Sequence, residues 1–553
     1  MSSKHKLCAD FETTTDKEDC RVWAAGLINI YTQKFTYTNN LNDFMAKILN
    51  IDEAIIYFHN LKFDGEFILY WLFENGFTHS RARHPNEKEF TTLISDKGAF
   101  YSMEICLNDN IIKIIDSLKI LPFKVEALPK MFGIEDKKLS INYTEKREIG
   151  HILTDDEVDY LKNDVTIVAK ALKILFDEGH TKMTQGSNAL ADYKKTIGTK
   201  NFKKCYPPPN YDHDIRQSYR GGFTYVNPKF AGKIISEGLV FDVNSLYPSV
   251  MKNDMLPIGE GIFFNGKYEK DKVYNLYIQM FRCQFELKPG HIPTIQLKNL
   301  SIFKVNEYVE SSKDEIITLC LTSVDLELFF KHYNIYNLEY ISGWKFRGVH
   351  GMFDDYINKW YKVKEQATID KNLGMRTLAK LMLNALYGKF GLNPKVKSKI
   401  PYLLDGNVKY EISQPETREP IYIPMATFIT AYARKKTIES AQKLYDRFIY
   451  ADTDSLHLLG KEIPKEIEIS NTKLGAWKLE GEFQKAKFLR QKCYVEEINN
   501  KLNVTCAGMP EACHKYVTFD NFEFGNKFAG KLQQKRVKGG IVLLDIDFTL
   551  KPW

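Results

Sequence analysis

The chain has 553 residues, which is too long for one hydrophobic core, so two to four domains are expected. Hydrophobic residues make up 44% of it and charged residues 27%, as is typical of a soluble globular protein and not of a disordered one. The formal net charge of +7 is too small to imply an anionic partner by itself.

Cysteine usage and the N-terminus indicate where the protein works. Nine cysteines are scattered without a Cys-x-x-Cys pair, which favours a reducing compartment and argues against a structural zinc site. No signal-peptide core follows Met1, and no apolar run approaches the roughly 18 residues that a membrane span needs. We therefore expect a soluble, cytoplasmic protein with no membrane partner.

The first 180 residues have the pattern of an α/β domain. Short apolar runs predict strands, and longer runs of helical period predict helices. The expected strands are 6–11, 22–31, 54–58 and 111–116, and the expected helices are 65–74 and 154–176. Thr154 is a good N-cap for the second helix, and Glu157 completes a capping box.

Four carboxylates and a tyrosine in this domain form a set that could bind metal ions. Asp10 and Glu12 are two apart on one strand, so both side chains point to one face. Asp64 lies where a strand passes into a helix, and Tyr160 and Asp164 share one face of the long helix. Each acid alone is typical of an ordinary surface residue. Together they could hold two metal ions about 4 Å apart and activate a water against a phosphodiester.

The next stretch leads toward a second acidic segment. Residues 184–211 are polar and end in three prolines, which predicts a linker or an extended surface segment. The pair Gly221-Gly222 permits either a close backbone approach or a plain turn. Asp242 follows an apolar strand. Between 255 and 350, short β-prone runs punctuated by Gly and Pro predict a β-rich insertion.

A basic, helical stretch covers residues 353–390. Between 359 and 399 there are ten basic residues and two acidic ones, which suits a phosphate backbone, although a solvated helix face is the alternative. Four polar residues recur at spacings of four, four and three and so form one stripe: Arg376, Lys380, Asn384 and Tyr387. Such a stripe could hold a triphosphate. A salt-bridged surface helix is the alternative, but the stripe contains no acid.

The stretch from Tyr450 to Leu458 is the centre of the chain's chemistry. Asp452 and Asp454 lie two apart between two β-prone runs, which predicts a strand, an acidic turn and a second strand. A solvated hairpin tip and a metal site are both compatible with this stretch alone. Acids near a core are costly unless a cation meets them, so Asp242 upstream favours the metal site.

Three further elements complete the pattern. A hairpin is expected over 402–412 with its turn at Asp405-Gly406, and a helix over 424–444. Lys492 and Tyr494 are expected on one face of a strand, and the last forty residues are expected to form a small closing subdomain.

Eight motifs, in this order along the chain, resemble those of the protein-primed DNA polymerases of family B, in particular the phi-twenty-nine-like group of small phages. The motifs are Asp10-Phe11-Glu12, His59-Asn60 with Asp64, Tyr160 with Asp164, Tyr219-Arg220-Gly221-Gly222, Asp242 with Tyr247-Pro248, Lys380 with Asn384 and Tyr387-Gly388, Tyr450-Ala451-Asp452-Thr453-Asp454, and Lys492-Cys493-Tyr494. The resemblance covers essentially the whole chain.

The resemblance implies an α/β plus α+β multidomain fold. An RNase H-like 3′-5′ exonuclease domain would precede a palm, fingers and thumb polymerase domain that carries two insertions. The implied boundaries are 1–183 for the exonuclease domain, 184–254 for the linker and first palm part, 255–352 for the first terminal-protein-region insertion, 353–392 for the fingers, 393–420 for the second insertion, 421–511 for the second palm part and 512–553 for the thumb.

The resemblance also implies roles for individual residues. Asp242 and Asp454, helped by the Val243 carbonyl, would bind the metal ions for synthesis. The metal ligands of the exonuclease would be Asp10, Glu12, Asp64 and Asp164, and Tyr160 would orient the water. The incoming nucleotide would contact Tyr247, Lys364, Arg376, Lys380 and Tyr387. DNA would contact Tyr57, His59, Asn60, Phe63, Phe67, Ser117, Leu118, Tyr219, Gly221, Gly222, Asp452, Lys492 and Tyr494.

The implied cofactor is Mg²⁺, two ions per active site, with Mn²⁺ able to substitute. The implied partners are template-primer DNA, dNTPs and a terminal protein whose hydroxyl primes synthesis, with the polymerase itself a monomer. Synthesis would be processive and strand-displacing, because the hairpin would help to encircle the DNA and to open the downstream duplex.

The chain departs from the family pattern at two places. Where the family has a catalytic lysine in a Tyr-His-Lys-like context, this chain reads Asn142-Tyr143-Thr144-Glu145-Lys146, so Lys146 either serves one register later or the role is weakened. The fingers are a few residues longer between Trp360 and Lys380 than in the family, so the position of Lys364 does not align directly with the family's nucleotide-binding lysine.

Two other functions compete with this interpretation. A reverse transcriptase would also use paired aspartates, although the N-terminal carboxylates and the Lys380 motif argue against it. A DNA-binding replication factor with decayed sites would be no enzyme, but every expected carboxylate is present.

Overall fold

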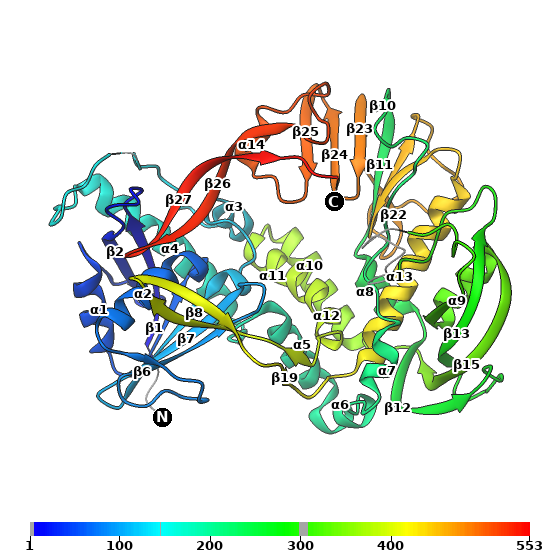
Figure 1. Ribbon diagram of the computed structural model, residues 1–553, viewed down its shortest axis with the longest axis horizontal. Coiled ribbons are helices and arrows are strands. Elements are labelled where there is room, and N and C mark those ends of the chain that lie inside the picture. Colours follow the sequence, from blue (N-terminus) through cyan, green and yellow to red (C-terminus); the bar gives the residue numbers. More distant parts are fainter. Residues whose placement is uncertain (1–4, 144, 298–307, 553) are drawn as a thin grey trace.

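The computed structural model describes residues 5–143, 145–297 and 308–552. Thr144 and part of the expected insertion, 298–307, lie outside these ranges. Figure 1 shows an N-terminal domain in blue and cyan on one side and a second body in green and orange on the other. The last two strands, in red, reach back from the second body to the first.

A mixed sheet in the order β3-β2-β1-β4-β8-β7-β6-β5 forms the centre of the N-terminal domain. Its strands are β1 (His5–Thr13), β2 (Val22–Asn29), β3 (Phe35–Thr38), β4 (Ala54–Phe58), β5 (Thr78–His79), β6 (Glu89–Ile94), β7 (Phe100–Leu107) and β8 (Asn110–Asp116). Strands β1, β4 and β8 run parallel at its centre, and β2 pairs antiparallel with β1. The four predicted strands are thereby confirmed.

Helices cover both faces of this sheet because the side chains of β1 alternate between two cores. Cys8 packs with residues of α4 (Asp155–Asp177) on one face. Phe11 packs on the other face with α1 (Leu41–Leu49) and α2 (Leu61–Glu74). Helix α4 begins at the predicted capping box, in which Thr154 Oγ1 accepts from Glu157 N. Helix α2 begins four residues earlier than predicted, so Asp64 lies in its first turn.

The predicted linker at 184–211 is wrong, since this segment is mostly helical. It forms α5 (Gln185–Ile197) and α6 (Thr199–Cys205), and α7 (Asp212–Arg216) follows. Its aromatic residues are the reason: Tyr193 and Tyr206 are buried, and the Tyr193 ring stacks on Phe353 with centroids 4.7 Å apart. Packing of these rings fixes helices that polar composition alone does not suggest.

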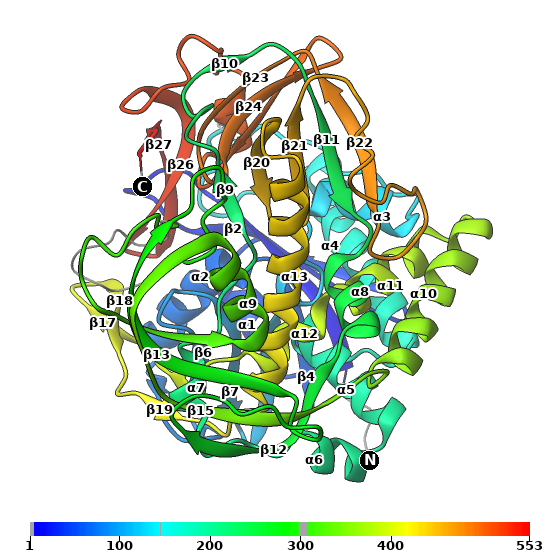
Figure 2. The same cartoon turned by 90° about the vertical axis from the view of Figure 1, so that its right-hand side faces the viewer.

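The second body is built on a sheet in the order β22-β11-β21-β20-β9. Its strands are β9 (Thr224–Val226), β11 (Gly238–Val243), β20 (Phe448–Asp452), β21 (Ser455–Leu459) and β22 (Trp477–Phe483). Figure 2 shows the long helix α13 (Ile423–Lys443) running beside these strands, with α8 (Leu246–Asn253) next to it. The sheet brings together segments about two hundred residues apart, because β11 pairs with β21 and places Asp242 opposite Ser455.

Helices and two insertions surround this sheet. The basic stretch forms α10 (Asp354–Ile369), α11 (Leu373–Ala385) and α12 (Tyr387–Phe390). The expected β-rich insertion is confirmed among the described residues and also contains a helix. It consists of β12 (Leu256–Asn265), β13 (Leu276–Leu287), β14 (Ile317–Thr322), α9 (Ser323–His332) and β15 (Tyr333–Val349).

The predicted hairpin is confirmed. Strands β17 (Lys399–Leu404) and β18 (Asn407–Ile412) are joined by Asp405 and Gly406, which both have positive φ, as a type I′ turn requires. The short strands β16 (Lys395–Val396) and β19 (Glu416–Thr417) form its stem. The C-terminal part contains β23 (Lys485–Arg490), β24 (Cys493–Ile498), β25 (Lys501–Cys506), α14 (Glu511–His514), β26 (Lys527–Val537) and β27 (Gly540–Thr549). The short strand β10 (Ile234–Ile235), from earlier in the chain, pairs with β23.

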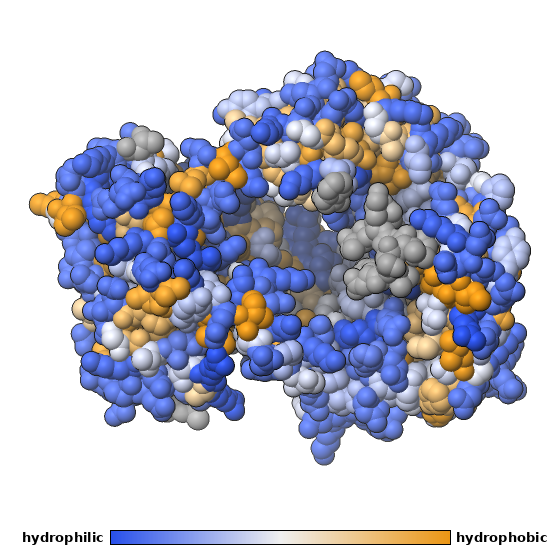
Figure 3. Space-filling view, viewed as in Figure 1, coloured by the Kyte–Doolittle hydropathy of each residue, from blue (hydrophilic) through white to orange (hydrophobic). Residues whose placement is uncertain are grey.

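The surface in Figure 3 is covered largely by hydrophilic residues and is hollowed near the centre of this face, between the two bodies. Of the helices that the structure describes, none has the length and apolar character needed to cross a membrane.

Two candidate active sites

The first site forms where the acidic turn meets β11. Asp454 lies in the turn between β20 and β21, and Val243 N donates to Asp454 O at 2.8 Å. This bond brings the Asp454 side chain beside that of Asp242. Burial, together with the negative charges of Asp454 and Glu480, raises the pKa of Asp242 to about 7. Burial and Asp452 also raise the pKa of Asp454. Carboxylates whose charged form is disfavoured by burial and by a neighbouring acid favour a cation beside them.

Asp452 is held differently from Asp454. Lys492 Nζ lies 2.9 and 2.8 Å from the two carboxylate oxygens of Asp452, and Thr224 Oγ1 donates to Oδ1 at 3.0 Å. The Asp452 charge is therefore already matched by a lysine. Asp454 is the acid of this pair that faces Asp242.

Of the two glycines in the Tyr219 motif, Gly222 makes a close backbone approach and Gly221 does not. A Cβ at Gly222 would lie 2.5 Å from Thr453 Oγ1, and Thr453 N donates to Phe223 O at 2.7 Å. A Cβ at Gly221 would have no atom of the described residues within 4 Å. Thr453 itself has φ 59°, so the turn is tight and is supported directly by the glycine segment.

A cavity of about 960 Å³ opens in front of Asp242 and Asp454. Every residue predicted for the incoming nucleotide lines it, namely Tyr247, Lys364, Arg376, Lys380 and Tyr387. Burial and the nearby cations Lys380 and Arg376 lower the pKa of Lys364, and burial and Arg376 lower that of Lys380. Cations that repel one another beside a cavity form a site for a polyanion such as a triphosphate.

Two aromatic rings form one wall of the cavity. The rings of Tyr247 and Tyr387 stack with centroids 3.9 Å apart and planes 20° apart. Tyr387 begins α12, just after α11 ends, so it leaves the strict helical stripe and turns toward Tyr247.

Lys478 and Glu480 also line this cavity, and the sequence analysis missed them. They lie on β22, where Lys478 is opposite Asp242, and they pair with each other at 2.6 Å. Lys478 and Glu480 are two apart on a β-prone run, so the sequence could have placed them on one face of a strand. Only the register of β22 against β11 brings them to the acids.

The expected placement of Lys492 and Tyr494 on one strand face needs correction. Lys492 has φ 53° and lies in the turn before β24, whereas Tyr494 is on the strand. Both still reach the acidic turn, because Lys492 binds Asp452 and the Tyr494 ring lies 5.1 Å from that of Tyr450.

The second site lies in the N-terminal domain. Oxygen atoms of Asp10, Glu12 and Asp164 all lie within 4.8 Å of one another. Burial and Asp164 raise the pKa of Asp10 to about 7, and burial and Asp10 raise the pKa of Glu12. Asp64 belongs to the same group, since burial and Asp10 raise its pKa as well. The structure thus brings together the four predicted acids from β1, α2 and α4.

Tyr160 and a lysine complete this site. Tyr160 OH is hydrogen-bonded to Tyr143 OH. Lys146 is 80% exposed and pairs with Glu148 at 2.9 Å, so it lies away from the acids. Lys138 Nζ instead lies 3.5 Å from Asp164 Oδ2, and its charge lowers the pKa of Asp10. Lys138 is therefore the lysine of this centre. It lies in a stretch without regular secondary structure, which has no periodicity from which its position could be predicted.

The residues predicted to hold a single strand divide into two groups. His59 and Asn60 lie at the start of α2, where His59 Nδ1 is 2.9 Å from Ser117 Oγ and Asp116 caps Asn60 N. Phe63 and Leu118 are partly exposed near them. The side chains of Tyr57, Phe67 and Ser117 are buried, so they would contact a strand only after their neighbours rearranged.

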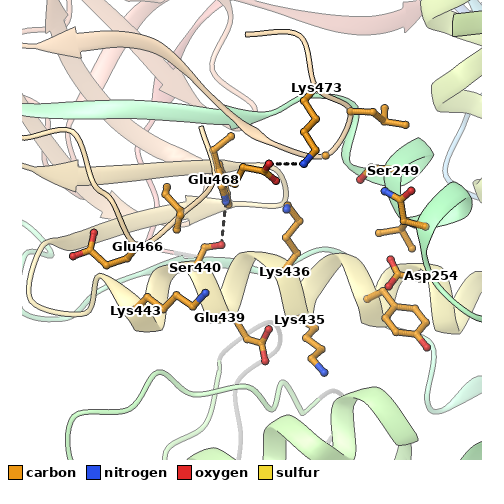
Figure 4. A pocket seen from close by; sticks show the side chains of 17 residues that line it. Ser249, Asp254, Lys435, Lys436, Glu439, Ser440, Lys443, Glu466, Glu468 and Lys473 are labelled. Atoms are coloured by element: carbon orange, nitrogen blue, oxygen red, sulfur yellow. Dashed lines mark hydrogen bonds and ion pairs between the residues drawn. The ribbon is translucent and has the colours of Figure 1, made fainter. Parts of the chain in front are cut away.

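A further cavity lies beside α13, away from both acidic centres (Figure 4). Lys435, Lys436 and Lys443 project from α13, and Lys473 pairs with Glu468 across the space. Four lysines and four carboxylates line this cavity, so its charges balance and no ligand of one charge is favoured.

Both acidic centres fit divalent cations. In the N-terminal site, Asp164 Oδ1 is buried and has no hydrogen-bond partner among the described residues. The charge of Asp10 raises the pKa of both Glu12 and Asp64. Carboxylates that repel one another in this way are the oxygen ligands that hard divalent cations prefer. Asp242 and Asp454 form a smaller set of the same kind.

A family profile described as DNA polymerase type B, organellar and viral, matches residues 46–155 and 141–472. The DNA polymerase of Bacillus phage phi29 is 47% identical over 582 residues, which cover 100% of both chains. The DNA polymerase of Streptococcus phage Cp-1 is 33% identical, with 98% of each chain covered. Both relatives are named DNA polymerases, which argues against the alternative of a reverse transcriptase.

Solved structures agree with these relatives. Phi29 DNA polymerase complexed with primer-template DNA and incoming nucleotide substrates matches with a TM-score of 0.94 at 46% identity, and 99% of this chain and 100% of that one are covered. Phi29 DNA polymerase complexed with single-stranded DNA gives a TM-score of 0.93 at 45% identity, with the same coverage. The predicted fold, an exonuclease domain followed by a polymerase domain, is confirmed. The chain therefore belongs to the phi29-like, protein-primed DNA polymerases of type B.

Proposed function

We propose that this polymerase performs nucleotidyl transfer at Asp242 and Asp454 and 3′-5′ hydrolysis at Asp10, Glu12, Asp64 and Asp164, with two divalent ions at each site. The cavity that joins two facing aspartates to unpaired cations carries this proposal. Among the described residues, no carboxylate lies within ion-pair distance of Lys364, Arg376 or Lys380. These cations are free to hold a triphosphate.

Synthesis would use the first site. Two Mg²⁺ ions, or Mn²⁺ in their place, held by Asp242, Asp454 and the Val243 carbonyl would neutralise charge on the phosphates and lower the pKa of the primer hydroxyl. Lys364, Arg376 and Lys380 would bind the triphosphate and stabilise the charge that leaves with pyrophosphate.

Aromatic and basic residues would set the geometry of that reaction. The stacked Tyr247 ring would lie under the sugar and exclude a 2′-hydroxyl, and Tyr387 would pack at the nascent base pair. Lys492, oriented by Asp452, and Tyr494 would hold the primer terminus. DNA passing between the two sites would contact Tyr219, Gly221 and Gly222.

Proofreading would use the second site. Its ions would bind Asp10, Glu12, Asp64 and Asp164. Tyr160 would orient the attacking water, and Lys138 would stabilise negative charge beside Asp164. A frayed 3′ strand would lie along His59, Asn60, Phe63 and Leu118, with Tyr57, Phe67 and Ser117 supporting them from beneath.

The partners would be template-primer DNA, dNTPs and a terminal protein that supplies the priming hydroxyl. The domain boundaries would follow the assignment given from the sequence, with 184–211 added as a helical part of the polymerase body. The polymerase would act as a monomer. Because the similar polymerases belong to phages of Bacillus and Streptococcus, it would act in the host cytoplasm.

Two variants, one single and one double, test the two-site proposal. Asp454→Ala should abolish primer extension and leave degradation of a labelled single strand unchanged. Asp10→Ala combined with Asp64→Ala should do the reverse. Loss of both activities from either change in a folded protein, judged by circular dichroism, would contradict it.

Strand displacement has its own test. A primed single-stranded circle, copied without accessory proteins, should give products far longer than the circle. Products that stop after one circuit would show that synthesis does not displace the strand ahead.

A further inference from the structure

A basic hollow forms where three distant parts of the chain meet. Its walls are the loop after β1, the hairpin β17–β18 and the end of β26 with the turn that follows, and its volume is about 790 Å³. The cations that line it are Lys17, Lys399, Lys409, Lys535, Arg536 and Lys538. Glu18 is the one acidic residue in its lining as the structure describes it.

Most of the charge in the basic hollow is unmatched. Lys17 lies 3.8 Å from Glu18, and Arg536 pairs with Glu66. Within the described ranges, no carboxylate lies within ion-pair distance of the other four lysines. Like charges held together at a junction repel, so a polyanion that neutralises them would be bound there.

The side chains around the basic hollow favour single-stranded nucleic acid. One face of the hairpin, with Val408 and Leu403, packs in the core of the N-terminal domain, and the opposite face presents Tyr402 and Lys409 side by side. Tyr402 is 39% exposed. An exposed aromatic ring beside lysines is the arrangement that binds unstacked bases and their phosphates.

The basic hollow is separate from both active sites. It shares no lining residue with the nucleotide cavity and contains none of the acids of the exonuclease centre. Figure 1 shows the yellow hairpin and the red strands β26 and β27 converging on the blue domain, away from β11 and α8. The template and the primer terminus belong at the two active sites, which leaves one strand of a replicating duplex without a place.

We propose that the basic hollow binds the displaced non-template strand as it leaves the hairpin. This inference rests on the proposed strand-displacing synthesis. The strand's phosphates would contact the four unmatched lysines, and Tyr402 would stack on a base. By holding the separated strand, the hollow would oppose its re-annealing ahead of the polymerase.

The test compares two triple variants. Lys409→Ala, Lys535→Ala and Lys538→Ala remove charge from the basic hollow. Lys270→Ala, Lys272→Ala and Lys465→Ala remove three exposed lysines elsewhere and serve as the matched control. Each protein would extend one primer on a single-stranded template and on the same template with a downstream strand annealed.

We expect the first variant to lose rate only where a strand must be displaced, and the control to behave as the parent protein does. Equal loss on both templates would mean that the hollow serves the template or the fold, and unchanged rates would mean an ordinary solvated surface. Either result would overturn the proposal.

A binding measurement separates this proposal from the proposed function. Fluorescence anisotropy would compare a primer-template carrying a ten-nucleotide thymidine flap with the same duplex without the flap. The parent should bind the flapped duplex more tightly, and the first variant should lose this difference, with the salt slope of log Kd reduced by about 2. If the parent failed to displace strands at all, this comparison would still show whether the basic hollow binds a single strand. A parent that bound both duplexes equally would overturn it.

Discussion

At the residue scale, the main finding is that the two acids of the turn differ in their partners. Lys492 and Thr224 hold Asp452, whereas Asp454 faces Asp242. A paired carboxylate orients its partner, and an unpaired one beside a second acid is suited to a cation. The same distinction separates Lys138, which lies among acids, from Lys146, which is solvated.

Lys138→Ala should reduce exonuclease activity by about 100-fold, because a fixed cation beside the reacting phosphate is lost. Primer extension should be unchanged. Lys146→Ala is the matched control, since it removes a lysine eight residues away that points into solvent. Single-turnover degradation of a labelled oligonucleotide measures both, and an equal effect of the two substitutions would contradict the assignment.

His332, at the end of α9, should make stability depend on pH. Its Nδ1 donates to Ile292 O at 2.8 Å, and burial lowers its pKa to about 4. Its Nε2 is buried and has no hydrogen-bond partner within the part of the chain that the structure describes. Between pH 6.5 and 4 the unfolded chain binds a proton at this residue and the folded chain does not, so stability falls as the pH falls. From pH 7 to pH 5 the loss should be roughly 2 kcal/mol, at about 1.4 kcal/mol per pH unit.

Thermal unfolding at pH 7 and pH 5 measures this effect. His332→Asn keeps a donor toward Ile292 but cannot titrate, so its melting temperature should fall less between the two pH values than that of the parent. His350→Asn, at an exposed histidine, should fall as much as the parent. Equal falls in all three proteins would show that His332 does not carry the effect.

At the element scale, the turn between β20 and β21 depends on contact with another segment. Thr453 adopts a positive φ, and the backbone at Gly222 approaches it more closely than any side chain would allow. The segment that leads into β9 therefore sets the position of both acids of the turn.

Gly222→Ala should displace the turn and lower polymerisation while sparing the exonuclease. Overpacking of this kind costs roughly 1–3 kcal/mol. Gly221→Ala is the matched control for this overpacking, because its Cβ would meet no described atom within 4 Å. Adding Thr453→Gly to Gly222→Ala removes the clash and should restore part of the rate of primer extension. Failure to restore any, with Gly221→Ala equally impaired, would sink this explanation.

At the scale of the whole molecule, Glu66 joins three parts of the chain. This carboxylate on α2 is buried, and its Oε1 accepts from Tyr410 OH of the hairpin at 2.9 Å and from Arg536 Nε of β26 at 2.8 Å. The Arg536 guanidinium also lies over the Tyr410 ring at 4.6 Å. Gly540 allows the last two strands to lie against Phe67, because a Cβ there would meet its ring at 2.4 Å. These contacts close the C-terminal strands onto the N-terminal domain.

Glu66→Gln should weaken this closure by roughly 1–3 kcal/mol, because Arg536 loses its charged partner. The loss stays in this range because the Arg536 side chain is partly exposed and remains hydrated. Products made in one binding event, with a heparin trap present, should become shorter. Glu411→Gln removes the exposed ion pair with Arg81, which joins the hairpin to the N-terminal domain, and should have no effect. Equal product lengths for both variants would contradict a role for Glu66.

Local patterns predicted much of the fold and both groups of acids. Strand alternation marked Asp10 and Glu12, the capping box marked the start of α4, and the Asp405-Gly406 turn fixed its hairpin. Three features lay beyond the reach of such patterns. The helices of 184–211 depend on aromatic packing, Lys138 lies in an irregular stretch, and Lys478 reaches the site only through strand register.

The sequence by itself determined the chemistry of this protein, because carboxylates, lysines and tyrosines at fixed local spacing have the same ligand preferences in any fold. The tertiary structure decided which of them act together. Asp242 faces Asp454 through the pairing of strands some two hundred residues apart, and Glu66 meets Arg536 across 470 residues. Such contacts depend on the packing of the whole chain, since each pays the entropy of closing a long loop and is stable only when many form together.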